Sequence, residues 1–386
     1  MTSSCDILVI GAGPAGALAA KEAAFAGCSV LLVEKRPAIG MPGRCAEGIM
    51  RGDLEEFFTP DPSWISAEID KAVFTGPDGK SVTISAKDNK TAGYTLNRKV
   101  FDRELVNAAA KAGAEVRVHT LAEPLLEEGR LTGAKLTCRG AASEVRAKVV
   151  IACDGVESQF ARAAGIDTTI SLKDIDTCVQ YAASGIEWDK RANGFWFSRK
   201  EAPGGYIWVF SKGFGKANIG IGIPGTESPG DRGGARAKDL LDAFMQNHFP
   251  NASVLEIISG GVPVCRPLKN TAGEGLLIAG DAARVTDPLT GGGIYNAFVT
   301  GTLAGKWAAK AIAAGDTSEK FLSGYDKEWR KTRMAKDIAR DWKLKEIFQK
   351  MDDHALASAM HLLKDMTLDE ITIPAVLKAA VKDRIF

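Results

Sequence analysis

Two glycine-rich segments of this chain have the residue types and spacing that bind the phosphates of a dinucleotide. The first is Gly11-x-Gly13-x-x-Gly16, which lies between an apolar run at 6–10 and an alanine-rich stretch at 17–26. In this strand–turn–helix pattern the first glycine permits the tight turn, the second lets the backbone approach a pyrophosphate, and the third permits close helix packing. The free N–H groups and the positive dipole end of the helix then face the phosphates.

An acidic residue supports the same chemistry. Residues 30–33 predict a second buried strand that ends at Glu34, 18 residues after Gly16, where a carboxylate accepts hydrogen bonds from ribose hydroxyls. The alternative is a strand–turn–helix that binds no ligand, and the position of the acid favours the dinucleotide. A second match to the glycine spacing, at 220–225, is followed by Pro, Glu, Ser and Asp rather than by a helix, so it predicts a strand end and a turn. We therefore expect no second dinucleotide fold for a nicotinamide cofactor.

The other glycine-rich segment begins at Gly280-Asp281 and ends at Gly291-Gly292-Gly293. Residues 275–281 predict a buried strand that delivers Asp281 to the carboxyl edge of the sheet, where ligands bind in doubly wound folds. Residues 294–313 then predict a helix whose N-terminus faces the phosphates. Together the two segments predict that distant parts of the chain bind one cofactor.

Between these segments lies a region rich in predicted strands with short connections, which is typical of an antiparallel sheet. In an extended chain Tyr206, Trp208 and Phe210 share one face. Three aligned aromatic residues are compatible with an ordinary core and also with the wall of an apolar tunnel, where Tyr and Trp each offer a polar group. The predicted strands are 178–182, 194–197, 206–210 and 217–221.

Composition limits the class of protein. The 386 residues suffice for two or three domains, and 45% hydrophobic with 25% charged residues is ordinary for a globular protein. A net charge of +1 gives no indication that the chain binds nucleic acid through its overall charge. No apolar run reaches the roughly 18 residues of a spanning helix, and the N-terminus lacks a basic signal region. Seven cysteines without a C-x-x-C pair and four histidines without metal spacing favour a reducing cytoplasm and no metal.

Two further segments extend the pattern. Residues 98–102 have the form Arg-x-x-x-Asp, and Cys153-Asp154-Gly155 predicts a turn after a buried strand. With the glycine-rich segments they resemble the FAD-dependent enzymes of the para-hydroxybenzoate hydroxylase group. In that group the Arg, here Arg98, meets the FAD phosphates, the Asp-Gly turn lies beside the cofactor, and the equivalent of Asp281 binds a ribityl hydroxyl. The resemblance implies FAD as the cofactor and a Rossmann-like FAD-binding domain, with the fold class α/β and an α+β second domain.

Two stretches narrow the resemblance to the archaeal geranylgeranyl reductases. Residues 42–48, Pro-Gly-Arg-Cys-Ala-Glu-Gly, resemble the Arg-Cys-x-Glu-Gly loop that lies beside the flavin in that family. Residues 203–210 resemble its Pro-x-x-Tyr-x-Trp-x-Phe-Pro substrate motif, with Ser211 in place of the final Pro. Carried over residue by residue, the FAD contacts of the family fall on Ala15, Glu34, Cys45, Ala46, Gly48, Arg98, Ala122, Asp281, Gly293 and Ile294. We also expect cofactor binding at Gly11, Gly13, Gly16, Arg44, Asp154, Gly291 and Gly292.

The resemblance implies a reductase that saturates C=C bonds of geranylgeranyl chains in digeranylgeranylglycerophospholipids, for archaeal membrane lipid biosynthesis. Flavin hydride transfer would be accompanied by protonation, because an isolated alkene accepts hydride poorly. The site therefore needs an acid, and Cys45 and Tyr206 are the candidates by placement. Cys45 could equally be a small residue packed against the flavin ring. Tyr206, Trp208 and Phe210 are the implied substrate-binding residues.

Other functions stay open at this point. They are an FAD-dependent monooxygenase or epoxidase of an apolar substrate, a flavoprotein that transfers electrons to a partner, and a lipid-binding module with vestigial FAD. The external electron donor is equally open between ferredoxin, a deazaflavin and NAD(P)H.

We expect three regions in the chain. Residues 1–50, 93–170 and 262–325 would form the FAD-binding domain, residues 51–92 and 171–261 the antiparallel-sheet substrate domain, and residues 326–386 a C-terminal helical region.

The expected helical region carries nine basic residues against five acidic ones over 326–350. Leu344, Ile347, Phe348 and Met351 share one helix face. That helix could cap the apolar tunnel, dock on an anionic membrane surface or pack on its own protein. The expected location is cytoplasmic, with peripheral contact at the inner membrane face as an option.

Overall fold

The structure, a computed structural model, describes residues 2–228, 236–362 and 367. Contacts between residues divide the chain into two units. Unit 1 comprises Met1–Met41, Lys99–Ile170 and Pro263–Trp342, and unit 2 comprises Pro42–Arg98, Ser171–Val262 and Lys343–Phe386. Both units are therefore assembled from segments that are far apart in the sequence.

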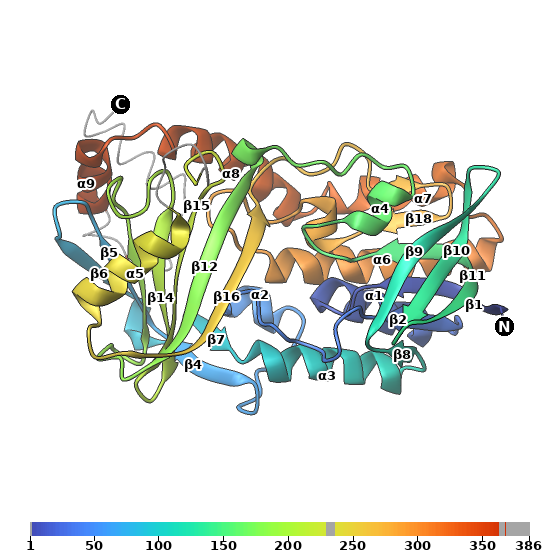
Figure 1. Ribbon diagram of the computed structural model, residues 1–386, viewed down its shortest axis with the longest axis horizontal. Helices are drawn as coiled ribbons and strands as arrows, with labels where there is room; N and C mark the ends of the chain where they lie inside the picture. Colours follow the sequence, from blue (N-terminus) through green and yellow to red (C-terminus); the bar gives the residue numbers. More distant parts are fainter. Residues whose placement is uncertain (1, 229–235, 363–366, 368–386) are drawn as a thin grey trace. The chain divides into compact units, whose positions relative to one another are not determined.

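Unit 1 is built on a mixed sheet with the order β17-β18-β11-β1-β2-β8 (Figure 1). The central strands β18, β11, β1, β2 and β8 run parallel, while β17 and the β9–β10 hairpin join antiparallel. Ile7, Leu8 and Val9 of β1 are fully buried, as expected for a strand covered on both faces. The strand bounds are β1 (Thr2–Ile10), β2 (Val30–Val33), β8 (Glu115–Arg117), β9 (Thr120–Glu127), β10 (Arg130–Cys138), β11 (Ala141–Ala152), β17 (Ala272–Gly273) and β18 (Leu276–Ile278).

Two helices of unit 1 are in backbone contact because glycines leave no side chain between them. They are α1 (Pro14–Phe25) and α6 (Ile294–Ala314), which Figure 1 draws in blue and orange. A Cβ atom on Gly301 would lie 2.2 Å from the carbonyl oxygen of Ala15, and one on Gly305 would lie 2.4 Å from that of Ala19. The helices that follow the two glycine-rich segments therefore pack directly on each other.

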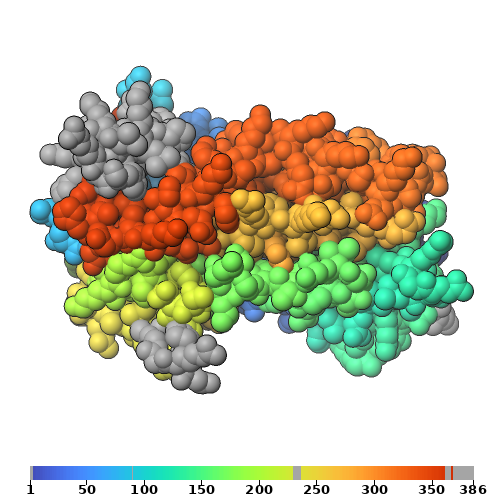
Figure 2. Space-filling view, turned by 90° about the horizontal axis from the view of Figure 1, so that it is seen from above, coloured from blue at the N-terminus to red at the C-terminus, as the bar shows by residue number. Residues whose placement is uncertain are grey.

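Helix α7 (Glu319–Trp329) packs on β17 and β18 of unit 1 and forms hydrogen bonds with the residues around them. The hydroxyl of Tyr325 donates to the carbonyl oxygen of Ile278 (2.9 Å), and the indole N–H of Trp329 donates to Oγ1 of Thr271 (2.9 Å). Figure 2 shows the orange residues of α6 and α7 beside the gold stretch that carries β17 and β18. The remaining short elements of unit 1 are α4 (Gln159–Ala163) and the 3-10 turn η3 (Gly280–Ala283), and α3 (Arg98–Lys111) has all but its first residue there.

Unit 2 contains a seven-stranded sheet with the order β16-β12-β15-β14-β13-β5-β6 and a three-stranded sheet with the order β3-β7-β4 (Figure 1). The pairs β12–β15, β15–β14, β14–β13 and β5–β6 are antiparallel, and β13–β5 is parallel. The strand bounds are β3 (Gly48–Met50), β4 (Ile65–Ile69), β5 (Lys71–Thr75), β6 (Ser81–Ser85), β7 (Gly93–Leu96), β12 (Ile175–Ser184), β13 (Ala192–Trp196), β14 (Tyr206–Gly213), β15 (Lys216–Pro224) and β16 (Ser253–Pro263).

The two faces of the larger sheet differ. One face packs against α5 (Ala237–His248), where Ile207 and Val209 of β14 belong to a fully buried cluster with Leu241 and Phe244. Because side chains alternate along a strand, Tyr206, Trp208 and Phe210 point to the opposite face. The aromatic triplet is therefore not part of the main core of unit 2.

The described part of the expected helical region is helical. It contains α7, α8 (Arg333–Phe348) and α9 (Asp353–Leu362), and residues 363–366 and 368–386 lie outside the described residues. Within unit 2, Leu344 is buried and the ring of Phe348 lies 5.7 Å from that of Phe197. Met351 lies beyond the end of α8, where its carbonyl oxygen accepts a hydrogen bond from Nε of Arg199 (2.8 Å). These contacts favour a helix end that packs on its own unit.

The observed units differ from the expected regions at several boundaries, and the expected C-terminal region is divided between the two units at residues 342 and 343. Residues 42–50 and 93–98 belong to unit 2, because β3 pairs with β7 in the smaller sheet. Residues 326–342 belong to unit 1, because α7 packs on β17 and β18. The functional assignment of an FAD-binding domain and a substrate domain stays a prediction.

Every helix among the described residues is too short or too polar to span a lipid bilayer.

The short elements of unit 2 complete the fold: α2 (Arg51–Glu55), η1 (Lys87–Asn89) and η2 (Leu172–Asp174).

Candidate functional site

The turn between β1 and α1 has the geometry that its glycines predict. Gly11 has φ +96°, and a Cβ atom there would lie 2.4 Å from the carbonyl oxygen of Cys153. A Cβ atom on Gly16 would lie 1.8 Å from the carbonyl oxygen of Gly11. Above Gly13, by contrast, a Cβ atom would meet nothing within 4 Å, and this residue caps α1 without any side-chain hydrogen bond. The start of α1 is therefore open to an anionic ligand.

Glu34 lies beside this turn, at the end of β2. Its Oε2 accepts the backbone N–H of Ala12 (3.0 Å), and its Oε1 accepts that of Arg36 (2.9 Å). Each carboxylate oxygen keeps a further lone pair, so a ribose hydroxyl can still donate to it. Ala122 lies on β9 close by, two residues after Thr120, whose N–H donates to the carbonyl oxygen of Glu34 (2.8 Å).

The second glycine-rich segment meets the first. Gly280 has φ +64°, its Cβ position lies 3.0 Å from Cβ of Ala15, and its N–H donates to Oγ1 of Thr300 (3.1 Å). The Cβ position of Gly293 lies 3.1 Å from Oδ1 of Asp281. Gly293 also caps α6, again without a side-chain hydrogen bond, so that Ile294 begins the helix. Asp281 and the start of α6 therefore lie together, and Gly280 joins them to the start of α1.

Asp287 shapes the loop that contains Gly291 and Gly292. Its Oδ1 accepts the backbone N–H groups of Leu289 (3.1 Å) and Thr290 (2.8 Å), and its carbonyl oxygen accepts that of Gly291 (2.9 Å). Burial, together with a hydrogen bond to Asp341, raises the pKa of Asp287 well above its usual range. Motif reasoning did not identify Asp287, although the Asp-Pro pair at 287–288 is a turn signal.

Asp154 offers a further polar group at the same edge of the sheet. Its Oδ2 accepts the N–H of Phe160 (2.8 Å), while its Oδ1 is buried and has no hydrogen-bond partner among the described residues. Burial raises the pKa of this carboxyl. A buried acceptor of this kind normally has a partner, and a ligand hydroxyl would provide one. The open turn, the uncapped helix starts and the orphan oxygen all fit a bound FAD.

The remaining predicted residues belong to unit 2. Cys45 is partly buried, and its Sγ accepts the N–H of Glu47 (3.1 Å) and a hydrogen bond from the side chain of Arg98. Burial raises the pKa of the Cys45 thiol, and the charge of Arg98 opposes that shift. Arg44 lies along β16, where a Cβ atom on Gly260 would approach its Cδ to 3.4 Å. The carbonyl oxygen of Ala46 accepts from the side-chain amide of Asn218 (3.3 Å).

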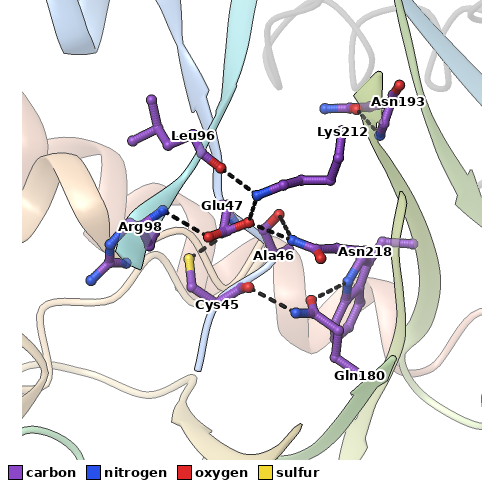
Figure 3. A network of polar contacts seen from close by, with 11 residues as sticks. Cys45, Ala46, Glu47, Leu96, Arg98, Gln180, Asn193, Lys212 and Asn218 are labelled. Atoms are coloured by element: carbon purple, nitrogen blue, oxygen red, sulfur yellow. Dashed lines mark hydrogen bonds and ion pairs between the residues drawn. The ribbon is translucent and has the colours of Figure 1, made fainter. Parts of the chain in front are cut away.

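A chain of hydrogen bonds links Cys45 to the aromatic residues (Figure 3). The side-chain amide of Gln180 donates to the carbonyl oxygen of Cys45 (3.0 Å), and the indole N–H of Trp208 donates to Oε1 of Gln180 (2.9 Å). Trp208 is 7% exposed, so its N–H has little access to water and needs this partner. Gln180 therefore forms hydrogen bonds with both the loop that contains Cys45 and the indole of Trp208.

We define the aromatic face as the rings on the side of the larger sheet opposite α5. Its ring centroids are 6.0 Å apart for Tyr206 and Trp208, and 5.4 Å apart for Phe195 and Phe210. All of its rings except that of Trp208 are only half-buried, unlike the core residues on the other side. An apolar ligand can therefore cover them. The aromatic face consists of Phe74, Phe195, Phe197, Tyr206, Trp208 and Phe210.

Glycines make room for these rings. A Cβ atom on Gly220 would lie 2.3 Å from the indole of Trp208, and one on Gly48 would lie 2.5 Å from the ring of Phe210. Gly220 lies on β15, so the spacing at 220–225 belongs to a sheet strand, as predicted from the residues that follow it.

Three polar residues outside the predicted motifs hold the Cys45 loop together with Glu47 of the Arg-Cys-x-Glu-Gly stretch. They are Gln180, Lys212 and Asn218, which form one network with Glu47 and Cys45 (Figure 3). A signal was present: Gln180 and Asn218 are polar residues inside apolar strands, and such residues are normally buried only with a partner.

Comparisons with known proteins agree with this geometry. Residues 174–262 match the model of the geranylgeranyl reductase catalytic domain, and residues 6–56 match the model of an FAD binding domain. A relative from Methanoculleus marisnigri, named digeranylgeranylglycerophospholipid reductase, is 49% identical over 384 residues, which cover 99% of this chain and 96% of the relative.

Solved structures share the fold. The crystal structure of a geranylgeranyl bacteriochlorophyll reductase-like protein from Thermoplasma acidophilum matches with a TM-score of 0.93 and 37% identity, covering 99% of this chain and 97% of that one. The structure of p-nitrophenol 4-monooxygenase from Pseudomonas putida matches with a TM-score of 0.72 at 17% identity, over 99% and 98% of the two chains. The second likeness shows the fold alone.

Proposed function

We propose, since this chain belongs to the family of digeranylgeranylglycerophospholipid reductases, that it uses FAD to saturate C=C bonds of geranylgeranyl chains in archaeal ether-lipid precursors. Bound FAD supplies the two-electron reducing chemistry. The observation that carries the proposal is the aromatic face of unit 2, to which Gln180 links the backbone carbonyl of Cys45.

Unit 1 supplies the binding groups for the cofactor. The open N-terminal end of α1 takes the pyrophosphate, Glu34 accepts from ribose hydroxyls, and the carboxylate of Asp281 accepts from a ribityl hydroxyl. In the loop at 291–293 the N–H of Gly291 donates to the carbonyl oxygen of Asp287 and that of Gly292 to Oγ1 of Thr290, so the loop would contribute a close backbone approach to the ring system.

We propose Cys45 as the proton donor. An isolated alkene needs a proton on one carbon when hydride reaches the other. The raised pKa of Cys45 keeps the thiol protonated, so a proton is available at Sγ. When Sγ gives it up, the adjacent Arg98 side chain and the Glu47 N–H stabilise the thiolate. Tyr206 is the alternative donor, and the substitution Cys45→Ala separates the two.

The aromatic face would bind the isoprenoid chain. Its half-buried rings offer apolar surface, and covering them removes that surface from water, which favours binding by about 25 cal/mol per Å². Trp208 is held by Gln180, so its ring is pre-organised for the chain. A cationic carbon formed on protonation would also be stabilised by the π-face of the indole.

Saturating each double bond consumes two electrons, so the proposal requires an external electron donor. Ferredoxin, a deazaflavin and NAD(P)H are the three classes to compare, by the rate at which each bleaches the flavin absorbance of the purified protein under anaerobic conditions.

A direct test incubates pre-reduced protein with a digeranylgeranyl phospholipid and follows the product by mass spectrometry. We expect a mass gain of about two units for each saturated bond, and no oxygen consumption that depends on the lipid. A Cys45→Ala variant that binds FAD normally should lose most of this activity. Unchanged lipid mass with fully reduced flavin would reject the proposal, and lipid-dependent oxygen uptake would indicate a monooxygenase instead.

Because the substrate is a membrane lipid, we also propose peripheral contact of this chain with the inner membrane face. Flotation with vesicles of anionic archaeal-type lipid should carry the protein to the top of a density gradient at low salt. Recovery of all the protein in the bottom fraction would count against this contact.

A further inference from the structure

Glu47 lies at the centre of a buried polar cluster in unit 2 (Figure 3). Its Oε1 accepts the backbone N–H of Arg98 (2.8 Å). Its Oε2 accepts the side-chain amide of Asn218 (2.7 Å) and forms an ion pair with the ammonium of Lys212. Lys212 also donates to the carbonyl oxygen of Leu96 (2.8 Å). Both ions thus have the additional hydrogen bonds that a buried ion pair requires.

The backbone of Glu47 adopts a conformation that side chains rarely allow. Its φ is +74°, in the left-handed region. In this conformation its N–H donates to Sγ of Cys45 (3.1 Å), and its carbonyl oxygen accepts the N–H of Leu96 (2.8 Å). Strained backbone of this kind persists only where the surrounding structure holds it. The contacts of the Glu47 carboxylate with the first residue of α3, with β14 and with β15 provide that hold.

Two charged groups act on the Cys45 thiol, and a third is paired with one of them. The carboxylate of Glu47 raises the pKa of Cys45, and the guanidinium of Arg98 lowers it. Lys212 pairs with Glu47 and so offsets part of the first effect. Removing the charge of Lys212 would therefore make the thiol harder to ionise, and removing the charge of Glu47 would make it easier.

We propose that Glu47, neutralised by Lys212, is a positioning residue that fixes the Cys45 thiol and determines how readily this thiol gives up its proton. The proposal deepens the proposed function and rests on it, because it concerns the same thiol. It also assigns a reason for the glutamate between Cys45 and Gly48: the side chain reaches β14, β15 and the start of α3, while the backbone N–H turns toward the sulfur.

The test measures the ionisation of Cys45 directly. FAD-loaded protein is alkylated with iodoacetamide across a range of pH, and the rate at the Cys45 peptide is followed by mass spectrometry. The variants are Glu47→Gln, Lys212→Met and Lys212→Arg. The control is Lys71→Met, which removes a lysine from the partly exposed ion pair with Asp189 in the same unit. Retained flavin absorbance and near-ultraviolet circular dichroism confirm that each variant is folded.

We expect the midpoint of the pH profile to move in opposite directions. Glu47→Gln should lower it and Lys212→Met should raise it, each by about one unit, which is about tenfold in acid dissociation. Lys212→Arg should restore the midpoint, and Lys71→Met should leave it unchanged. Midpoints that move in the same direction, or that do not move in folded Lys212→Met protein, would overturn the proposal.

Asn218→Ala serves as a second variant that keeps the Glu47 side chain in place. It removes the hydrogen bonds to the Glu47 carboxylate and to the carbonyl oxygen of Ala46 without changing charge, so we expect faster alkylation of Cys45 with an unchanged midpoint. An unchanged alkylation rate would contradict the positioning role. These alkylation measurements need no lipid. Full reductase activity in Cys45→Ala would reject Cys45 as the proton donor. The effect of Glu47 on the ionisation of the thiol would still be measured independently.

Discussion

Gly301 and Ala15 are in contact through the backbone alone: a Cβ atom on Gly301 would lie 2.2 Å from the carbonyl oxygen of Ala15. This contact brings α6, which follows the second glycine-rich segment, onto the first turn of α1. The absence of a side chain at Gly301 therefore lets the two helices pack closely, and with them the two segments that carry the predicted cofactor contacts of unit 1.

Replacing Gly301 with Val should separate these helices. Since the clash is with backbone, it cannot be relieved by a side-chain rotation, and we expect a loss of at least about 1–3 kcal/mol in the free energy of unfolding. Purified variant should also retain much less FAD, measured by flavin absorbance per chain. The control is Gly52→Ala in α2, where a Cβ atom meets nothing within 4 Å. Full FAD content in a stable Gly301→Val protein would contradict this account of the contact.

Glu34→Ala should weaken FAD binding. The substitution removes an acceptor for ribose hydroxyls and the two hydrogen bonds that hold the turn at Ala12 and Arg36. Hydrogen bonds to a charged group contribute about 1.5–3 kcal/mol, so we expect the dissociation constant to rise about 10–100-fold. Titration of deflavinated protein with FAD, followed by flavin fluorescence, measures it. The exposed Glu104→Ala on α3 is the control, and equal affinities in the two variants would remove Glu34 from the cofactor site.

Gln180→Leu should release both the Cys45 loop and the indole of Trp208. It leaves the Trp208 N–H buried without a partner, and we expect the free energy of unfolding to fall by about 1–3 kcal/mol. Lipid reduction should fall mainly through kcat, because the thiol loses its fixed position. Trp208→Phe, which removes the N–H but keeps a ring, should show a smaller loss. The exposed Gln246→Leu on α5 is the matched control.

Asp176 should make the stability of the protein depend on pH. It shares a face of β12 with Cys178 and Gln180, and its Oδ1 is buried with no hydrogen-bond partner among the described residues. Burial raises the pKa of Asp176 to about 6, against the charge of Lys345. Between its unfolded value of 3.8 and about 6, the folded chain therefore keeps a proton that the unfolded chain has lost.

The proton on Asp176 therefore contributes its whole stabilisation of the folded state below pH 3.8. This contribution to the free energy of unfolding is lost as the pH rises through about 6. For a shift of this size the loss is up to about 3 kcal/mol. Urea unfolding of the wild-type protein and of Asp176→Asn at several pH values measures the difference, which should be absent in the partly exposed Asp174→Asn. Parallel curves for wild type and Asp176→Asn would show that this carboxyl is not shifted.

Local patterns were sufficient for several features of the fold and the site. The spacing of Gly11, Gly13 and Gly16 predicted the turn and the helix, because backbone sterics and helix packing act over a few residues. Alternation along 206–210 predicted that Tyr206, Trp208 and Phe210 share a face. Antiparallel pairing of the strands around them was predicted from short strands and turns, and β12, β15, β14 and β13 pair in this way, whereas β13 and β5 run parallel.

The amino-acid sequence by itself therefore determined the cofactor turn, the strand that carries the aromatic residues, and the family. Only the tertiary structure decided which side of the sheet those rings face and which polar groups meet around Cys45. Glu47 pairs with Lys212 and Asn218, and Trp208 with Gln180, across strands whose register no local pattern encodes. The physical reason is that strand pairing and burial are set by packing of the whole unit, and the polar groups that packing buries must find their partners wherever the chain returns.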